Sequence, residues 1–303
     1  MPDEELALVP KHRYTAFLAV IALGCSDTTG SDTPLPTPPD RSAPVLVAAG
    51  DIASCSSSGD EATAALLDRL PGTVATLGDN AYPDGAASDF ADCYDPTWGR
   101  HKARTRPSPG NHDYHTPGAS GYYAYFGESA GPSGQGYYSY DVADWHIISL
   151  NSNADMAAGS AQEQWLRADL AASTKLCTLA YWHHPRFSSG TLLGGYNSTA
   201  PLWQALYDHN ADVVLAGHEH NYERFAPQTP AGEADPARGI RAFVVGTGGD
   251  DLHSGYSATA NSEVFDGTTF GVLRLDLLAG SYNWQFVPVA GQSFTDSGSG
   301  SCH

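Results

Sequence analysis

The stretch Ala211–Tyr222, ADVVLAGHEHNY, constrains the fold most strongly. It starts as an apolar run that predicts a buried strand, and it continues through Gly217 into two histidines separated by one residue. A strand that ends in Gly-His-X-His presents two imidazoles beyond its carboxyl end, where open α/β sheets build their binding sites. The stretch therefore predicts an α/β protein with a histidine-containing site at the edge of a sheet.

Three other apolar runs end in the same way. They are Val45–Gly50, followed by Asp51; Thr73–Gly78, followed by Asp79 and then Tyr82; and Leu176–Trp182, followed by His183. Carboxylate, phenol and imidazole groups are all potential metal ligands. The four runs together predict that several strand ends contribute to one metal site.

Helical and extended patterns alternate between these runs. Helices are expected at residues 60–70, 160–172 and 199–209, and further strands at 145–150, 240–246, 270–278 and 281–289. This mixture predicts two packed sheets flanked by helices. The chain of 303 residues is long enough for one large domain with a sizeable core.

The charge balance restricts the partners. Lys and Arg number 15 against 34 for Asp and Glu, which gives a formal net charge of −19. Such a surface repels nucleic-acid polymers and anionic membranes, so neither is an expected partner. An anionic substrate would need a local reversal of sign, which bound cations can provide.

The N-terminus has the composition of an export signal. Lys11 and Arg13 precede the apolar stretch Thr15–Gly24, which is too short to span a bilayer but suits the core of a signal peptide. Cys25 follows in a context similar to a bacterial lipoprotein processing site, although Ala22 stands where that site prefers Leu or another bulky aliphatic residue. A lipidated Cys25, a plain secretion signal and a buried helix are the alternatives.

The next segment, Ser26–Pro44, is rich in Ser, Thr, Asp and Pro and predicts an unfolded tether. We therefore expect a signal peptide at 1–25, of lipoprotein type if Cys25 is modified, a tether at 26–44, and one globular domain at 45–303. The expected location is the periplasm, the cell surface or the extracellular space. Membrane contact is expected only through a lipid on Cys25.

Four further cysteines, an even number in an exported chain, suggest two disulfides with three possible connectivities. Cys55 and Cys93 both lie in Ser-, Asp- and Gly-rich segments after Asp51 and Asp79, where a bridge would brace two ligand loops. We favour that pair, and Cys177 with Cys302 then follows by elimination. The alternative is that Cys177, inside an apolar strand, is a buried thiol.

Each potential ligand alone has a simpler explanation, because an Asp after a strand is commonly a turn or cap residue and a lone His is commonly a hydrogen-bonded polar group. The ordered set is more informative. Along the chain it consists of Asp51, Asp79, Tyr82, Asn111, His183, His218 and His220. Oxygen and imidazole ligands form a harder donor set than that of a structural zinc site.

These residues occur in sequence blocks that resemble the calcineurin-like metallophosphoesterases, and among them most closely the purple acid phosphatases. The blocks are GDIA (Gly50–Ala53), GDNAY (Gly78–Tyr82), GNHDY (Gly110–Tyr114), HHP (His183–Pro185), GHEH (Gly217–His220) and GTGG (Gly246–Gly249). Ala53 stands where most of the superfamily has a ligand histidine, and Tyr82 stands where the purple enzymes have a ligand tyrosine. The resemblance covers Val45–Val289 and concerns the catalytic domain, without the additional N-terminal β-domain of plant-type enzymes.

The resemblance implies a four-layer αββα sandwich of two mixed β-sheets, with a dinuclear metal site at the carboxyl ends of the central strands. The metal ligands that it implies form two sets: Asp51, Asp79, Tyr82 and His220 for Fe(III), and Asp79, Asn111, His183 and His218 for a divalent Fe, Zn or Mn ion. Asp79 would bridge the two ions. A ferric ion is acidic enough to lower the pKa of a phenol from its usual value near 10.

The resemblance also implies roles for three residues near the ligands. The family's His-X-Pro pattern selects His183 as the ligand, which leaves His184 as a substrate contact or as a packed structural histidine. His112 is the implied general acid and a substrate contact, and Asp113 could orient it. This chain has GNHD where the purple enzymes commonly have GNHE, so the role of Asp113 carries over least directly.

The function implied is hydrolysis of phosphate monoesters of small molecules by metal-hydroxide attack, as in acid phosphatases. A phosphodiesterase or nucleotidase on the same centre is the alternative, because the metal ligands do not distinguish these substrates. A third hypothesis is an inactive, metal-stabilised binding protein at the cell surface. A missing ligand or acid would favour it, and here the set is complete.

Overall fold

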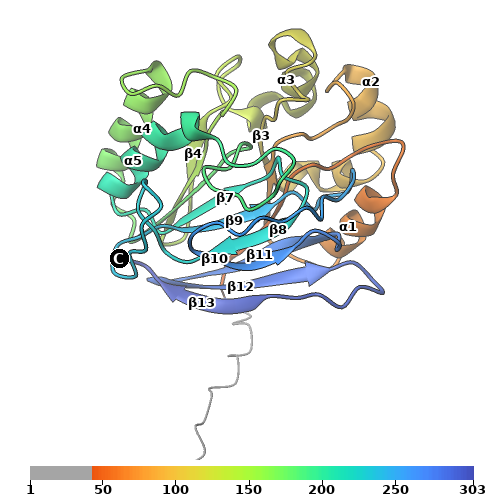
Figure 1. Ribbon diagram of the computed structural model, residues 1–303. Helices are drawn as coiled ribbons and strands as arrows, with labels where there is room; N and C mark the ends of the chain where they lie inside the picture. Colours follow the sequence, from red (N-terminus) through yellow and green to blue (C-terminus); the bar gives the residue numbers. More distant parts are fainter. Residues whose placement is uncertain (1–42) are drawn as a thin grey trace, which may run out of the picture. The chain divides into compact units, whose positions relative to one another are not determined.

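The computed structural model describes residues 43–303, which form two β-sheets packed face to face with helices on both outer sides (Figure 1). This arrangement confirms the four-layer αββα sandwich. The expected signal peptide, 1–25, and nearly all of the expected tether, 26–44, lie outside the described residues. Pro44, the last residue assigned to that tether, accepts a hydrogen bond from the Leu277 backbone N–H at 2.8 Å.

The first sheet has the strand order β13-β12-β11-β1-β2-β3. Its strands are β1 (Val45–Ala49), β2 (Thr73–Leu77), β3 (Thr105–Ser108), β11 (Gly271–Leu278), β12 (Ser281–Pro288) and β13 (Ser297–Ser301). Strands β1, β2 and β3 run parallel, whereas β11 pairs with β1 in antiparallel fashion. The parallel half therefore brings three strand ends to the same edge.

The second sheet has the order β10-β8-β9-β7-β6-β5-β4. Its strands are β4 (Tyr138–Val142), β5 (Trp145–Ser149), β6 (Cys177–Tyr181), β7 (Val213–Ala216), β8 (Tyr222–Phe225), β9 (Arg241–Val245) and β10 (Ser262–Asp266). The central strands β5, β6, β7 and β9 are parallel, and antiparallel strands flank them. Buried parallel strands explain the continuous apolar runs in the sequence.

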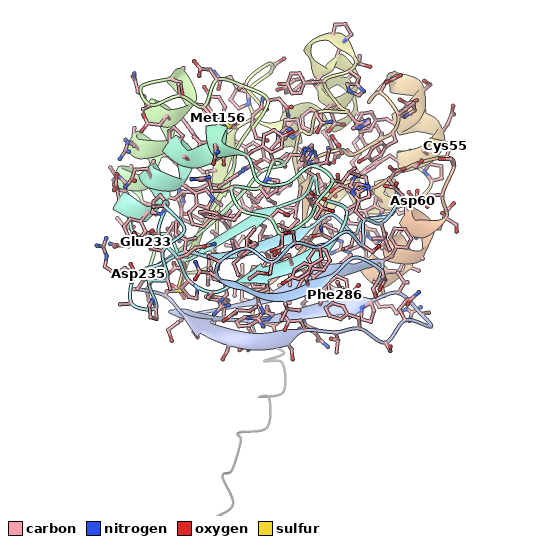
Figure 2. All side chains as sticks on the ribbon, viewed as in Figure 1. Cys55, Asp60, Met156, Glu233, Asp235 and Phe286 are labelled. Atoms are coloured by element: carbon pink, nitrogen blue, oxygen red, sulfur yellow. A yellow bond between two sulfur atoms is a disulfide. The ribbon has the colours of Figure 1, made fainter. Side chains whose placement is uncertain are left out.

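Strand β6 shows how the sequence divides the hydrophobic core. Leu179 and Tyr181 belong to the core between the sheets, whereas Ala180 belongs to the core beneath the helices. This alternation follows from the two-residue period of a strand. Phe286 of β12, labelled in Figure 2, packs at 4.6 Å between ring centroids against Tyr222 of β8, and so joins the two sheets.

Helices cover the outer faces. On the second sheet lie α4 (Ala161–Ala172) and α5 (Ala200–Asp208). Ser160 caps the N-terminus of α4, because its Oγ accepts from the Glu163 N–H at 3.3 Å. The first sheet is flanked by α1 (Gly59–Leu67), α2 (Ala87–Asp89), the π-helical η1 (Phe90–Tyr94), the 3-10 helix η2 (Trp98–Arg104) and α3 (Ser120–Phe126). Short 3-10 segments complete the set: η3 (Pro117–Ala119), η4 (Gly127–Ala130) and η5 (Asn197–Thr199). Among residues 43–303, no helix is long and apolar enough to cross a bilayer.

The structure contains all the helices and strands expected from apolar periodicity, with ends that differ by a few residues at most. Five strands were not expected from the sequence: β3, β4, β8, β10 and β13. β3 contains Pro107 and is tolerated because it lies at a sheet edge, and β13 has the sequence SGSGS. These strands depend on their neighbours for their structure.

Both expected disulfides are present, Cys55–Cys93 and Cys177–Cys302. The alternative of a buried free thiol at Cys177 is therefore wrong. Cys93 lies in the helical segment η1 rather than in an irregular loop, because residues 87–94 continue as helix after the Tyr82 turn. The bridge thus connects that helical segment to the loop after β1.

Candidate metal centre

The seven residues expected to bind metal lie together where the carboxyl ends of the two sheets meet. Asp51 follows β1, Asp79 and Tyr82 follow β2, Asn111 follows β3, His183 follows β6, and His218 and His220 follow β7. The backbone joins the sheets at this edge, because Gly50 N–H donates to Val245 C=O of β9 at 2.9 Å. The two sheets together therefore build one site.

The turns after the strands have unusual backbone conformations. Asp51, Asp79 and His218 have φ values of 60°, 48° and 74°, in the left-handed region that few non-glycine residues occupy. Gly78 has a φ of 85°, and a Cβ at that position would lie 2.6 Å from the His183 side chain. Strain of this kind gathers at functional sites, where the surrounding structure holds it in place.

The first group of side chains converges around the Tyr82 hydroxyl. Its oxygen lies 3.2 Å from Asp51 Oδ1, 3.2 Å from Asp79 Oδ2 and 3.2 Å from His220 Nε2. His220 Nε2 is in turn 3.4 Å from Asp51 Oδ1. These four atoms belong to the four residues that the resemblance assigned to the ferric ion.

The second group converges around His183 Nε2. This nitrogen lies 3.0 Å from Asn111 Oδ1, 3.1 Å from His218 Nδ1 and 3.2 Å from Asp79 Oδ2. Asp79 Oδ2 is thus close to both groups. A single carboxylate oxygen between two sets of donors is the arrangement that a bridging ligand requires.

The chemistry of these contacts fits bound cations. His183 Nδ1 is 2.8 Å from the Leu77 carbonyl, which can only accept, so Nδ1 carries the proton in the neutral ring and Nε2 presents a lone pair to Asn111 Oδ1. Asp79 Oδ1 accepts the His112 N–H and Asp51 Oδ2 accepts the His218 N–H, both at 2.8 Å. The other oxygen of each carboxylate faces the centre. Several lone pairs therefore point toward the same space, and a bound cation would stabilise this arrangement.

Comparison with known proteins agrees with this geometry. Residues 44–222, more than half of the chain, match the family model described as calcineurin-like phosphoesterase. The chain belongs to the calcineurin-like phosphoesterase family.

The relatives of this phosphoesterase include plant enzymes. Purple acid phosphatase 22 of Arabidopsis thaliana is 34% identical over 119 residues, which are 38% of this chain and 27% of the relative. Purple acid phosphatase 15 of the same plant is 27% identical over 223 residues, 61% of this chain and 41% of the relative. The matches thus span well under half the length of these relatives.

A solved purple acid phosphatase, PPD1 from yellow lupin (Lupinus luteus) seeds, superposes with a TM-score of 0.68. It shares 19% sequence identity, and the match covers 86% of this chain and 54% of the lupin chain. At this identity the similarity establishes the fold, which matches the two-sheet sandwich.

The electrostatics of the phosphoesterase centre are dominated by burial and by opposite charges. Burial disfavours protonation of His183, but the charge of the Asp79 carboxylate outweighs burial and raises the pKa of His183 to about 9. Burial likewise disfavours protonation of His220, but Asp51 and Asp251 outweigh it and raise the pKa of His220 to about 11. Burial, followed by the charges of Asp79 and Asp51, raises the pKa of Tyr82 well above its ordinary value. A cation bound beside Tyr82 would oppose this effect and favour the phenolate.

His112 and Asp113 differ in position. The His112 ring packs on Tyr82 at 4.5 Å between centroids, and its Nδ1 donates to the Pro83 carbonyl at 2.6 Å, so Nε2 carries the lone pair of the neutral ring. Asp113 is fully buried, and its Oδ2 accepts from the Gly110 N–H at 2.8 Å and Asn80 Nδ2 at 2.9 Å. Asp113 therefore braces the GNHD loop from behind, and burial raises its pKa to about 7.

His184 lies beside the second group. Its ring centroid is 4.4 Å from that of His218, and its Nδ1 is 2.7 Å from Ser152 Oγ. Burial, followed by the charge of His183, lowers its pKa to about 3. Ser152 Oγ accepts from the His184 backbone N–H, so its hydroxyl hydrogen is available to Nδ1 of the neutral ring.

Sequence reasoning missed three residues that contact the candidate ligand histidines. Tyr196 Oη lies 3.1 Å from His218 Nε2, Asp251 is bonded to His220 Nδ1, and the His253 ring stacks on His220 at 4.3 Å with the planes parallel. Asp251 and His253 follow the Gly246–Gly249 block closely, so that block was a usable signal. Tyr196 lies in a Gly-rich loop with no local signal.

Proposed function

We propose that this protein hydrolyses phosphate monoesters at a dinuclear metal centre, as an acid phosphatase does. The observation that carries the proposal is the position of Asp79 Oδ2, which lies 3.2 Å from both Tyr82 Oη and His183 Nε2. Membership of the calcineurin-like phosphoesterases supports the reaction class. The complete ligand set argues against an inactive binding protein.

The donor set suits two unlike ions. We assign Fe(III) to Asp51, Asp79, Tyr82 and His220, because a phenol of raised pKa ionises only beside a strong Lewis acid. A divalent Fe, Zn or Mn ion is assigned to Asp79, Asn111, His183 and His218, which supply oxygen and imidazole donors. When bound, two such ions would supply a water-derived nucleophile and neutralise charge on the phosphoryl oxygens.

The side chains around the ligands would move the proton and position the ester. His112 would protonate the departing alkoxide through Nε2, since its Nδ1 is committed to the Pro83 carbonyl. His184 would donate a hydrogen bond to a phosphoryl oxygen as a neutral imidazole, because Ser152 serves its Nδ1. Asp113 would act as a positioning residue, through the Gly110 N–H that precedes Asn111 and His112.

A substrate panel on the metal-replete protein tests this function. We expect hydrolysis of 4-nitrophenyl phosphate at acid to neutral pH, with lower kcat/KM on bis(4-nitrophenyl) phosphate, and loss of both rates after chelation and their return with iron and zinc. A faster rate on the diester or selectively on nucleoside monophosphates would instead assign a phosphodiesterase or a nucleotidase. No hydrolysis of any ester by protein containing two metal ions would contradict the proposal.

We also propose that the protein is exported, with residues 1–25 as signal peptide, 26–44 as tether and 45–303 as the catalytic domain. Two disulfides in the described residues support a location outside the reducing cytosol. Fractionation of cells that express the full chain tests this, because a wholly cytosolic protein would contradict it. Release of the protein from membranes by Cys25→Ala would identify a lipid anchor.

A further inference from the structure

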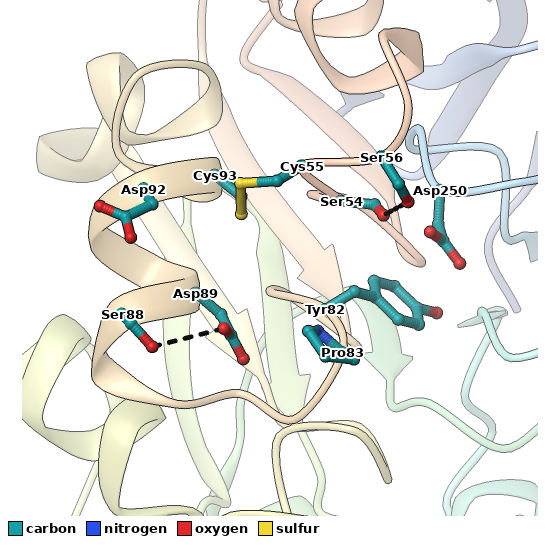
Figure 3. Close-up of a pocket in the computed structure, with 10 residues that line it drawn as sticks. All are labelled: Ser54, Cys55, Ser56, Tyr82, Pro83, Ser88, Asp89, Asp92, Cys93 and Asp250. Atoms are coloured by element: carbon teal, nitrogen blue, oxygen red, sulfur yellow. Dashed lines mark hydrogen bonds between the residues drawn. A yellow bond between two sulfur atoms is a disulfide. The ribbon is translucent and has the colours of Figure 1, made fainter.

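A cavity of about 570 Å³ lies beside the metal centre (Figure 3). Its lining includes Ser54, Ser56, Tyr82, Pro83, Asp92 and Asp250, together with the Cys55–Cys93 disulfide. The volume falls within the range of about 300–1,000 Å³ typical of small-molecule sites. The cavity is therefore large enough for an organic group of monosaccharide size.

The cavity adjoins the groups that act on the ester. Tyr82 is shared, because it lines the cavity while its hydroxyl lies 3.2 Å from both Asp51 Oδ1 and Asp79 Oδ2. His112 does not line the cavity, but its ring packs on Tyr82 and its Nδ1 donates to the Pro83 carbonyl, and both Tyr82 and Pro83 line the cavity. A general acid must lie next to the oxygen that leaves, so the leaving alcohol belongs on this side of the centre.

The walls are fixed before any ligand binds. The disulfide ties the loop after β1 to η1, although the two cysteines are 38 residues apart. On the opposite wall Asp89 Oδ2 accepts the Asp84 and Ala86 N–H groups at 3.1 and 3.0 Å, which secures the start of α2. A preformed wall can discriminate between alcohols without losing conformational entropy when the ligand binds.

The polar groups on these walls select for charge. Asp92 and Asp250 lie at opposite sides of the cavity in Figure 3, with the hydroxyls of Ser54, Ser56 and Ser88 between and below them. The described residues that line the cavity include no lysine or arginine. Carboxylates and hydroxyls accept hydrogen bonds from alcohol and ammonium groups, and the carboxylates repel a further anion.

We infer that this cavity is the leaving-group site, and that it takes a polyhydroxylated alcohol, neutral or positively charged, such as a sugar or an amino sugar, and excludes alcohols that carry additional negative charge. The inference rests on the proposed phosphatase function. It specifies the substrate class, which the metal ligands do not. It predicts poor hydrolysis of polyphosphorylated esters, whose leaving groups are polyanions.

Three sugar phosphates of similar size test the inference. Glucosamine 6-phosphate, glucose 6-phosphate and 6-phosphogluconate release a cationic, a neutral and an anionic alcohol. We expect kcat/KM to fall in that order, by about twofold to fivefold for each change of charge, since a partly exposed charge pair contributes up to about 1 kcal/mol. The metal-replete protein is used, with 4-nitrophenyl phosphate as the reference substrate.

Two variants assign the discrimination to the cavity. Asp92→Asn and Asp250→Asn should each reduce the ratio of kcat/KM for glucosamine 6-phosphate over 6-phosphogluconate by about twofold to fivefold. The ratio is measured within one enzyme, so a change in metal loading cancels. Asp144→Asn removes the same charge from the exposed turn between β4 and β5 and should leave the ratio unchanged.

The outcomes are distinct. Hydrolysis of the aryl ester with equal kcat/KM for the three sugar phosphates, or with a preference for 6-phosphogluconate, would overturn the inference and leave the phosphatase function in place. The inference would also be overturned if Asp144→Asn lowered the ratio as much as Asp92→Asn does, because the overall charge of the protein would then explain the preference. Absence of hydrolysis even of the aryl ester by the metal-replete protein would overturn both proposals.

Discussion

In Asp51 and Asp79, one carboxylate oxygen accepts a hydrogen bond from a backbone N–H and the other oxygen faces the centre. This division fixes the orientation of the free oxygen, because the bonded oxygen cannot leave its N–H without an energetic cost. The N–H groups belong to His218 and His112, so the ligand blocks orient one another. Single substitutions here should therefore affect metal binding more than folding.

Tyr82→Phe should remove the visible absorption of the iron-loaded protein and leave both metal positions partly occupied. The reason is that the phenol is the only proposed ligand able to donate charge to Fe(III) as a phenolate, while Asp51, Asp79 and His220 stay in place. The visible spectrum of both proteins, recorded at equal iron content, checks this. A band that persists in Tyr82→Phe would show that the absorption has another origin and would remove Tyr82 from the ligand set.

His112→Ala should retain both metals and lose turnover in proportion to the difficulty of the leaving group. A general acid contributes about 10²- to 10⁴-fold when the alkoxide is a poor leaving group, and little when it is nitrophenolate. Rates on an alkyl phosphate and on 4-nitrophenyl phosphate measure the difference. His209→Ala is the control, since His209 lies at the C-cap of α5 on the outer face of the second sheet. An equal loss on both esters would exclude the acid role.

At the scale of helices and strands, His146 connects three elements. Its Nδ1 lies 2.9 Å from Asp141 of β4, and its Nε2 lies 2.8 Å from Asp169 of α4. Burial lowers the pKa of this β5 histidine, but the bonds to Asp169 and Asp141 outweigh it, so the pKa is raised above its ordinary value of about 6.5. The folded chain therefore binds this proton more tightly than the unfolded chain.

The stabilisation from His146 should be complete below pH 6.5 and lost as pH rises through its folded-state pKa. His146→Gln should accordingly lower the free energy of unfolding by about 2 kcal/mol at pH 5.5, where the substitution removes charge-assisted hydrogen bonds. The loss should be smaller at pH 9, because the wild-type histidine is then less protonated and its hydrogen bonds are weaker. Denaturant unfolding at both pH values, at constant metal content, provides the comparison.

The same substitution at His209, at the C-cap of α5, serves as the control. It should produce a smaller difference between the two pH values. If the destabilisation by His146→Gln were as large at pH 9 as at pH 5.5, the ion pairs would not account for it, and packing of the ring between β5 and α4 would.

At the scale of the whole molecule, the site exists because two sheets end at one edge. The sequence predicts this well where the signal is local: apolar runs predict the central strands, and the residue after each run predicts a ligand. It does not predict β13, because SGSGS is extended only through pairing with β12. Tyr196 and the cavity beside Tyr82 depend on contacts between distant segments, which have no signature in either segment alone.

The disulfides were predicted correctly, although one of the two pairs followed only by elimination. Cys177 and Cys302 are 125 residues apart, and their pairing joins β6 to the end of β13 across the two sheets. The even number of cysteines indicated two bonds, but their positions in space follow from the packing of the sheets. Local pattern thus predicts the central strands, the larger helices and the candidate ligands, whereas tertiary packing determines the remaining strands, the supporting residues and the shape of the site.

The most direct test of the account is the number of metal ions bound per folded chain, measured by elemental analysis after reconstitution with iron and zinc, for the wild-type protein, Asn111→Ala and Asp79→Ala. Two ions are expected in the wild-type protein, about one in Asn111→Ala, which lacks a ligand of the second group only, and fewer than one in Asp79→Ala, because Asp79 Oδ2 faces both groups. A wild-type protein that binds one ion or none, or an Asp79→Ala variant that keeps two, would contradict the dinuclear centre.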